Sequence, residues 1–132
     1  MVPKHALIID DNAANVNVLA EMLTIEGLSC TKVQSPGNLG GTLEQLSAVD
    51  IVFLDLELPG THGYQIFQYL RADPRFKNIP VVVYSVHTSE INAARELGFH
   101  SFLGKPLNAD NFPEQLARIL RGERVWAISS NY

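Results

Sequence analysis

The sequence has little of what marks several large classes of protein. It contains a single cysteine, Cys30, so no disulfide can form within the chain, and no apolar run approaches the roughly 20 residues of a membrane-spanning helix. Its 10 lysine and arginine residues do not cluster, and 14 acidic residues bring the formal net charge to −4, which leaves no electrostatic footprint for nucleic acid. We therefore expect neither a membrane nor a nucleic acid as partner.

Two further absences narrow the chemistry. No signal peptide precedes the first apolar run, which together with the lone thiol is typical of a cytoplasmic protein. His62, His87 and His100 match no metal-site spacing, so we interpret them as packed or solvated side chains. Cys30 lies among apolar residues, which favours a buried and unreactive thiol.

Short apolar runs alternate with helical patterns along most of the chain. The runs predict strands over residues 6–9, 28–33, 51–54, 81–84 and 99–103. Apolar residues at helical spacing predict the helices between and after them, on the faces Val16-Leu19-Ala20-Leu23, Leu39-Leu43-Leu46, Gly63-Ile66-Phe67-Leu70, Ile91-Ala94-Leu97 and Phe112-Leu116-Ile119-Leu120. Five β-α pairs in succession predict a three-layer α/β/α domain with a parallel sheet and right-handed crossovers.

Local signals place several helix ends. Glycines are predicted to end three helices, at Gly27, Gly98 and Gly122. Asn12 is a predicted N-cap of the first helix, and Thr88 or Ser89 of the fourth. The pair Gly40-Gly41 predicts that the second helix is short. We expect one domain over residues 1–122 and a tail over 123–132 without a clear period.

Polar side chains follow the predicted strands at the points where the strands end. Asp10 and Asp11 follow the first, Asp55 the third, Ser85 the fourth and Lys105 the fifth. Because the carboxyl ends of parallel strands meet at one edge, we expect these groups to converge. Three clustered carboxylates need a cation, and an all-oxygen set favours Mg²⁺. A lysine and a hydroxyl beside them suit an incoming phosphoryl group, with Asp55 as the nucleophile.

These motifs resemble the receiver domain of two-component response regulators, in its single-domain, chemotaxis-receiver-like form. The matching pieces are residues 9–11, residues 55–59 with Gly63 following, residues 80–85 and residues 102–106, and the resemblance covers about residues 5 to 121. It implies a flavodoxin-like (βα)5 fold with a parallel five-stranded sheet in the order 2-1-3-4-5. It also implies Mg²⁺ as the cofactor.

The resemblance assigns roles around the acceptor. Asp55 corresponds to the phosphoacceptor and a metal ligand, and Asp11 to a direct metal ligand. Asp10 corresponds to the acid that binds the ion mainly through water, and the backbone carbonyl of Glu57 to the third protein ligand. Glu57, two residues after the acceptor, and His87, two after the switch hydroxyl, fall at positions that tune hydrolysis of the phosphoryl group.

The phosphate side of the site is assigned in the same way. Ser85 corresponds to the switch hydroxyl, the backbone of Val86 to a phosphate-binding group, and Lys105 to the phosphate-pairing lysine, followed by a cis bond to Pro106. Phe102 takes the aromatic switch position, where its lack of a hydroxyl implies switching by packing alone. The bulk of Val86 departs from the family and narrows access to the phosphate.

The implied function is a signalling domain and not an enzyme, although self-phosphorylation and autophosphatase chemistry accompany the resemblance. Asp55 would accept a phosphoryl group from a histidine kinase or a phosphotransfer protein. An output protein would then bind the face made by the fourth helix, fifth strand and fifth helix. A stand-alone receiver and part of a larger regulator are both compatible with the sequence.

Three rival functions remain to be weighed. A pseudo-receiver that binds proteins without phosphorylation usually lacks an acid, the lysine or the acceptor, all of which are present here. A phosphatase of the haloacid dehalogenase type would carry Asp-x-Asp on the first strand, whereas Asp55 follows the third and Glu57 takes the second position. A flavin-binding flavodoxin would need a phosphate loop where Asp10 and Asp11 lie.

Overall fold

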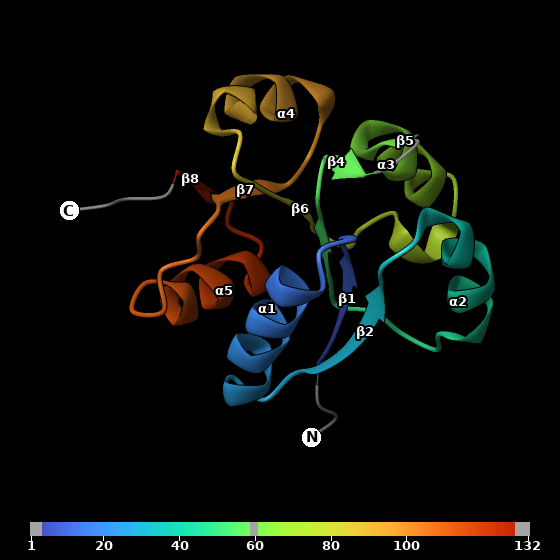
Figure 1. Ribbon diagram of the computed structural model, residues 1–132, viewed down its shortest axis with the longest axis horizontal. Helices are drawn as coiled ribbons and strands as arrows, with labels where there is room; N and C mark the ends of the chain where they lie inside the picture. Colours follow the sequence, from blue (N-terminus) through green and yellow to red (C-terminus); the bar gives the residue numbers. More distant parts are fainter. Residues whose placement is uncertain (1–3, 59–60, 129–132) are drawn as a thin grey trace.

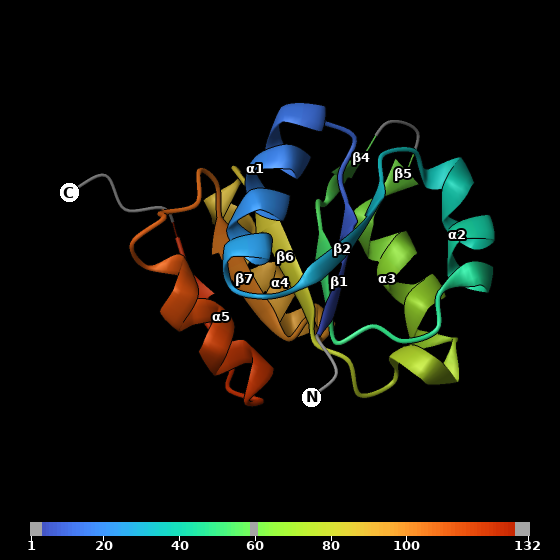
Figure 2. The same cartoon turned by 90° about the horizontal axis from the view of Figure 1, so that it is seen from below.

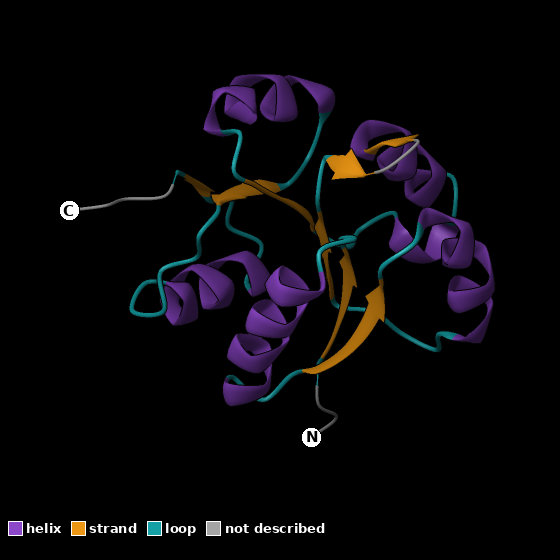
Figure 3. Ribbon diagram, in the orientation of Figure 1, coloured by secondary structure: helices purple, strands orange, loops and turns teal. Residues whose placement is uncertain are grey.

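The fold is an α/β sandwich built on one parallel sheet (Figures 1 and 3). The structure, a computed structural model, describes residues 4–58 and 61–128. Within these residues the sheet has six strands in the order β2-β1-β3-β6-β7-β8. Their bounds are His5–Ile9 (β1), Ser29–Val33 (β2), Ile51–Leu54 (β3), Val81–Ser85 (β6), Ser101–Gly104 (β7) and Trp126–Ala127 (β8). A separate antiparallel pair joins β4 (Glu57–Leu58) to β5 (Thr61–His62).

Helices cover both faces of the sheet, so the predicted three-layer flavodoxin-like class is confirmed. Helices α1 (Ala13–Ile25) and α5 (Phe112–Leu120) lie on one face, and α2 (Leu39–Gln45), α3 (Gly63–Arg71) and α4 (Ile91–Leu97) on the other (Figures 1 and 2). The predicted order of the first five parallel strands is also confirmed. None of the helices within the described ranges is both long and apolar enough to cross a bilayer.

Strand β3 shows why the sheet is two-sided. Its four residues are completely buried and alternate between the two cores. Val52 and Leu54 pack with the α2-α3-α4 layer, and Ile51 and Phe53 with the α1-α5 layer. Because successive side chains of a strand point to opposite faces, a continuous apolar run is what a strand in this position requires. Asp55 follows directly and is therefore positioned by a strand that is buried on both faces.

Several predicted helix ends are confirmed. The Asn12 side chain accepts a hydrogen bond from the Asn15 N–H at 3.0 Å and caps α1. Glycines follow three helices with φ angles of 89°, 97° and 94°, at Gly27, Gly98 and Gly122. Helix α2 has only 7 residues, as the glycine pair predicted.

Cys30 is half-buried instead of fully buried, and burial raises the pKa of its thiol.

Other boundaries differ from the sequence prediction. The fifth strand begins at Ser101, because the Phe99 N–H closes the end of α4 on the Ala94 carbonyl at 3.1 Å. A 3-10 turn over Thr88–Glu90 precedes α4, so neither Thr88 nor Ser89 is its cap. In the sequence, Pro59 and Gly60 predict a turn after the third strand, and both lie outside the described residues.

The parallel sheet has one strand more than the five that were predicted. β8 extends the sheet beyond β7, in parallel, with Phe102 opposite Trp126 and Leu103 opposite Ala127. A two-residue strand carries no periodic signal, so its pairing depends on partners more than twenty residues away in the sequence. Part of the segment expected to be a tail therefore belongs to the sheet.

A close backbone contact fixes the loop after Asp55. The Gly63 N–H donates to the Leu56 carbonyl at 2.8 Å, and α3 starts at this point. A Cβ atom on residue 63 would lie 2.6 Å from the Leu56 Cα and 2.8 Å from the Asp55 carbonyl oxygen. Only glycine allows the backbone of residue 63 to come this close to the Asp55-Leu56 backbone. The start of α3 is thereby coupled to the loop that follows Asp55.

Gly63→Ala should lower the free energy of unfolding by about 1–3 kcal/mol, because backbone atoms must move to admit the new methyl group. Gly41→Ala is the matched control. It lies inside α2 with nothing within 4 Å of its added Cβ, and should raise stability by up to about 1 kcal/mol. Urea denaturation of both variants checks the pair, and equal effects would contradict the steric argument.

Candidate functional site

Backbone hydrogen bonds position Asp10 and Asp55 at the same edge of the sheet. The Asp10 N–H donates to the Val33 carbonyl at 3.1 Å and the Asp55 N–H to the Ile9 carbonyl at 3.0 Å, so both residues continue the strand ladders. Asp11 follows Asp10 and is exposed. One carboxylate oxygen from each of the three acids lies within 4.8 Å of the others. The predicted convergence of the acids is therefore present.

Lys105 lies between two of these acids. Its Nζ is 2.9 Å from Asp10 Oδ2 and 3.7 Å from Asp55 Oδ2, and only 8 % of its side chain is exposed. The Lys105 N–H donates to the Ser85 carbonyl at 2.8 Å, which fixes the residue at the end of β7. The bond from Lys105 to Pro106 is cis, as the resemblance implied.

Tyr84 contacts the ammonium group of Lys105 through its ring, a contact that no sequence pattern predicted. Lys105 Nζ lies 4.2 Å from the centroid of the Tyr84 ring, whose negative face attracts a cation. The Tyr84 hydroxyl donates to the Asn15 carbonyl at 3.1 Å, which fixes the ring. Tyr84 entered the prediction only as part of an apolar strand, and its position just before Ser85 was the one available signal.

Burial makes Asp55 harder to ionise than an ordinary aspartate. It raises the pKa of the Asp55 carboxyl from 3.8 to about 6, with a smaller rise from the neighbouring Asp10. The Glu57 N–H, which donates to Asp55 Oδ1 at 3.1 Å, and the Lys105 ammonium both oppose this increase. The group nevertheless stays mostly ionised at neutral pH, which a nucleophile requires.

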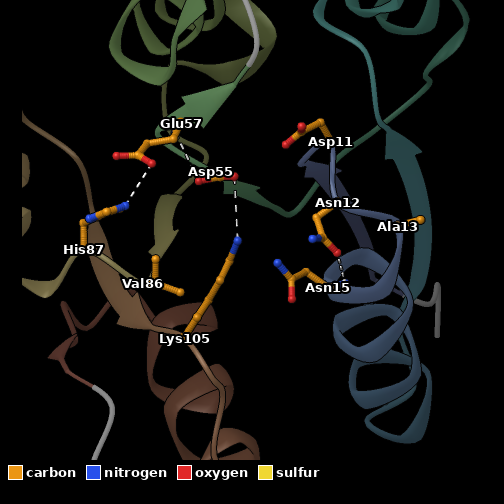
Figure 4. Close-up of a pocket in the computed structure, with 9 residues that line it drawn as sticks. All are labelled: Asp11, Asn12, Ala13, Asn15, Asp55, Glu57, Val86, His87 and Lys105. Atoms are coloured by element: carbon orange, nitrogen blue, oxygen red, sulfur yellow. Dashed lines mark hydrogen bonds and ion pairs between the residues drawn. The ribbon is translucent and has the colours of Figure 1, made fainter.

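Asp11 and Asp55 border a hollow of about 500 Å³ (Figure 4). Its lining residues are Asp11, Asn12, Ala13, Asn15, Asp55, Glu57, Val86, His87 and Lys105. Lys105 points toward Asp55 from one side, while Asp11 lies on the α1 side (Figure 4). Val86 is 60 % exposed and contributes its side chain to the wall. The hollow is polar and open, which suits a small charged group and not a large apolar ligand.

Ser85 and His87 arrange the loop after β6. Ser85 is buried, and its Oγ accepts a hydrogen bond from the His87 N–H at 3.0 Å, which leaves the Ser85 O–H as a donor. His87 Nε2 lies 2.9 Å from Glu57 Oε2, and both residues line the same side of the hollow (Figure 4). No sequence pattern predicts this pairing, because it joins two separate loops through the rotamers of two side chains.

Phe102 is fully buried in the core under α3 and α4. The resemblance placed Phe102 at the aromatic switch position, where the ring would change its packing when the domain is activated. In this structure the ring is already inside, so no exposed-to-buried transition starts from this conformation. Its backbone is held by the residue just before β8, because the Phe102 N–H donates to the Val125 carbonyl at 2.8 Å.

Solved structures share this architecture. A CheY-like receiver domain from Methylobacillus flagellatus superposes with a TM-score of 0.77 at 29 % identity, covering 89 % of this chain and 99 % of that one. A putative response regulator from Chloroflexus aurantiacus gives a TM-score of 0.79 at 25 % identity, covering 91 % and 99 %. The fold is therefore that of known response regulators.

Several sequence relatives match most of this chain, although the relatives themselves differ in length. Protein RcaC from Microchaete diplosiphon is 28 % identical over 96 % of this chain, which spans only 20 % of that protein. The chain spans 53 % of the transcriptional regulatory protein PhoB from Pseudomonas aeruginosa, at 27 % identity. Protein PilH from the same organism is 26 % identical over 88 % of this chain, and the match covers 97 % of PilH.

The family described as the response regulator receiver domain matches residues 6–117, a range that contains the three clustered acids, the buried lysine and the loop between them. The chain belongs to the receiver domain family of two-component response regulators.

Proposed function

We propose that this receiver accepts a phosphoryl group on Asp55 and signals through altered protein contacts. The observation that carries the proposal is the position of Lys105 Nζ, within 4 Å of both Asp10 and Asp55 at the wall of an open hollow. A cation held there by buried acids is available to an incoming anion. The donor would be a histidine kinase or a phosphotransfer protein.

A divalent cation fits the acidic side of the hollow. Asp11, Asp55 and the carbonyl of Glu57 would hold Mg²⁺ directly, with Asp10 acting through water. Every one of these donors is a hard oxygen, the type that Mg²⁺ prefers. Bound there, the ion would neutralise the oxygens of the phosphoryl group and relieve the repulsion among the carboxylates.

The transfer itself makes and breaks one bond each. An ionised Asp55 oxygen attacks phosphorus, a P–O bond forms, and the P–N bond to the donor imidazole breaks, leaving its electron pair on the imidazole nitrogen. Lys105 and the Val86 N–H bind the phosphoryl oxygens, and the Ser85 O–H donates to one of them as a charge-assisted hydrogen bond. The attack needs no general base, because Asp55 is already mostly deprotonated at pH 7.

The output would pass through the face formed by α4, β7 and α5. Ser85 lies at the end of β6 and pairs with Gly104 of β7, so a movement at Ser85 reaches that strand directly. Because Phe102 is already inside, we expect a modest effect of phosphorylation on partner binding and a detectable basal affinity. The alternative is a pseudo-receiver that binds partners without phosphorylation, which the complete set of site residues disfavours.

Phosphorylation should require Asp55 and Mg²⁺. Wild-type protein treated with acetyl phosphate and Mg²⁺ should gain one phosphoryl group in intact mass spectra. Asp55→Asn should gain none, and EDTA should prevent the gain in wild type. Asp110→Asn, which removes an exposed acid outside the hollow, serves as the control and should react like wild type. No labelling of wild type would support the pseudo-receiver instead, whereas equal labelling of wild type and Asp55→Asn would contradict the assignment of Asp55 as the acceptor.

Stability without Mg²⁺ should fall as pH rises from about 4 to 7. The Asp55 pKa is about 6 in the folded state and near 3.8 in the unfolded chain, so the folded state binds the extra proton in this window. Asp55→Asn should flatten this slope and, at pH 7, raise the free energy of unfolding by on the order of 1 kcal/mol, since the open hollow screens part of the penalty.

Urea denaturation in EDTA at several pH values measures the slope, and Asp110→Asn should keep it. A slope unchanged in Asp55→Asn would assign it to other groups. Saturating Mg²⁺ should remove the slope in wild type, because the ion favours the ionised carboxyl.

Glu57 should protect the phosphoryl group from hydrolysis. Its side chain lines the hollow beside His87, where its charge disfavours the approach of hydroxide. Glu57→Ala should therefore shorten the phosphoryl half-life about three- to tenfold, the scale of one screened charge interaction. His87→Gln, which removes the partner but keeps the Glu57 charge, should change it less. A longer half-life in Glu57→Ala would mean that Glu57 positions the attacking water instead.

A further inference from the structure

The outer edge of β7 is occupied by a strand that lies beyond the family match. The match ends at residue 117, whereas β8 covers Trp126–Ala127. β8 runs parallel to β7 and lies between α4 and α5 (Figures 1 and 2). Residues that follow the last helix thus return to the face on which an output partner is expected.

Successive side chains around β8 pack alternately against the two hydrophobic cores of the domain. Val125 is 4 % exposed and packs, with Ala127, into the core beneath α1 and α5. Trp126 points the other way and packs against the core beneath α3 and α4, where the Arg95 guanidinium lies 4.8 Å from its ring centroid. This alternation is that of a true strand, and the Trp126 position has a cation over its aromatic face.

Hydrogen bonds in both directions join the segment over residues 124–127 to the rest of the domain. Ser101 is completely buried, and its Oγ accepts the Val125 N–H at 2.9 Å. The Val125 carbonyl in turn accepts the Phe102 N–H at 2.8 Å. The Arg124 guanidinium donates to the carbonyls of Phe99 and His100 at 3.3 Å and 3.4 Å. A buried hydroxyl aimed at an incoming backbone N–H is a built feature of the β7 edge.

The resident strand is short enough to leave. β8 has two residues, lies at the edge of the sheet and is followed by Ile128, which is 56 % exposed. Edge segments with few hydrogen bonds open more readily than central strands. When β8 is away, β7 presents an unpaired backbone edge, the Ser101 hydroxyl and an apolar slot beside Arg95. Such an edge binds extended peptides by adding them as a strand.

We propose that the edge of β7 between α4 and α5 is a strand-addition site for an extended partner segment that carries an aromatic side chain, and that β8 is its resident ligand. The partner segment runs parallel to β7 and places a small aliphatic, an aromatic and a small residue in the order of Val125, Trp126 and Ala127. Binding requires β8 to leave, so the chain inhibits its own docking site. This inference goes beyond the proposed function and does not depend on phosphorylation of Asp55.

The probe is a fluorescein-labelled peptide with the sequence of residues 123–128, titrated into the full chain and followed by anisotropy. Trp126→Ala in the chain should weaken the resident strand and bind the peptide at least about tenfold more tightly than wild type. Ile128→Ala, beyond β8, should bind like wild type. A peptide with alanine in place of its tryptophan should lose binding to the Trp126→Ala chain.

Two further measurements separate docking from loss of fold. Adding Ser101→Ala to the Trp126→Ala chain should weaken peptide binding at least about tenfold, because the receptor hydroxyl is gone. Arg95→Gln, which leaves β8 intact in sequence, should speed hydrogen exchange of the Phe102 amide while central β3 amides stay unchanged. Equal peptide affinity of wild type and Trp126→Ala, no binding to either, or no effect of Arg95→Gln on Phe102 exchange would overturn the proposal.

Discussion

The buried contact between Lys105 and Asp10 is the constraint on which the site depends. Asp10 has no exposed surface, and a carboxylate in that position is tolerable only with a charged partner. Lys105 supplies it at 2.9 Å and remains 3.7 Å from Asp55. The same ammonium thus stabilises the fold and faces the acceptor. Removing it would leave a buried charge unpaired, which is far more costly than losing an exposed ion pair.

Much of this site was predictable because its position follows from two simple properties of parallel sheets. A buried apolar run ending in a carboxylate gives a strand end, and parallel strands bring their ends to one edge, so Asp10, Asp55 and Lys105 had to converge. The strand order came from the family resemblance, since alternation of strands and helices does not fix it. Gly27 and Gly98 ended helices as expected, because a positive φ is a local requirement that glycine meets.

The features that escaped prediction depend on contacts between distant parts of the chain. The apolar Phe99 suggested strand, but its N–H is taken by the end of α4. The pairing of His87 with Glu57 depends on two side-chain rotamers across separate loops. β8 depends on the Ser101 hydroxyl and on the open edge of β7, neither of which appears in the local pattern around Trp126.

The sequence contains one tryptophan, and the structure places it in β8. Its indole is half-buried, with the Arg95 guanidinium over the ring. The emission of an indole responds to solvent and to nearby charge, so the intrinsic fluorescence of the native protein reports on one specific place, the outer edge of β7. The domain carries its own spectroscopic label at the point where its last strand joins the sheet, and no dye or engineered residue is needed to follow that strand in solution.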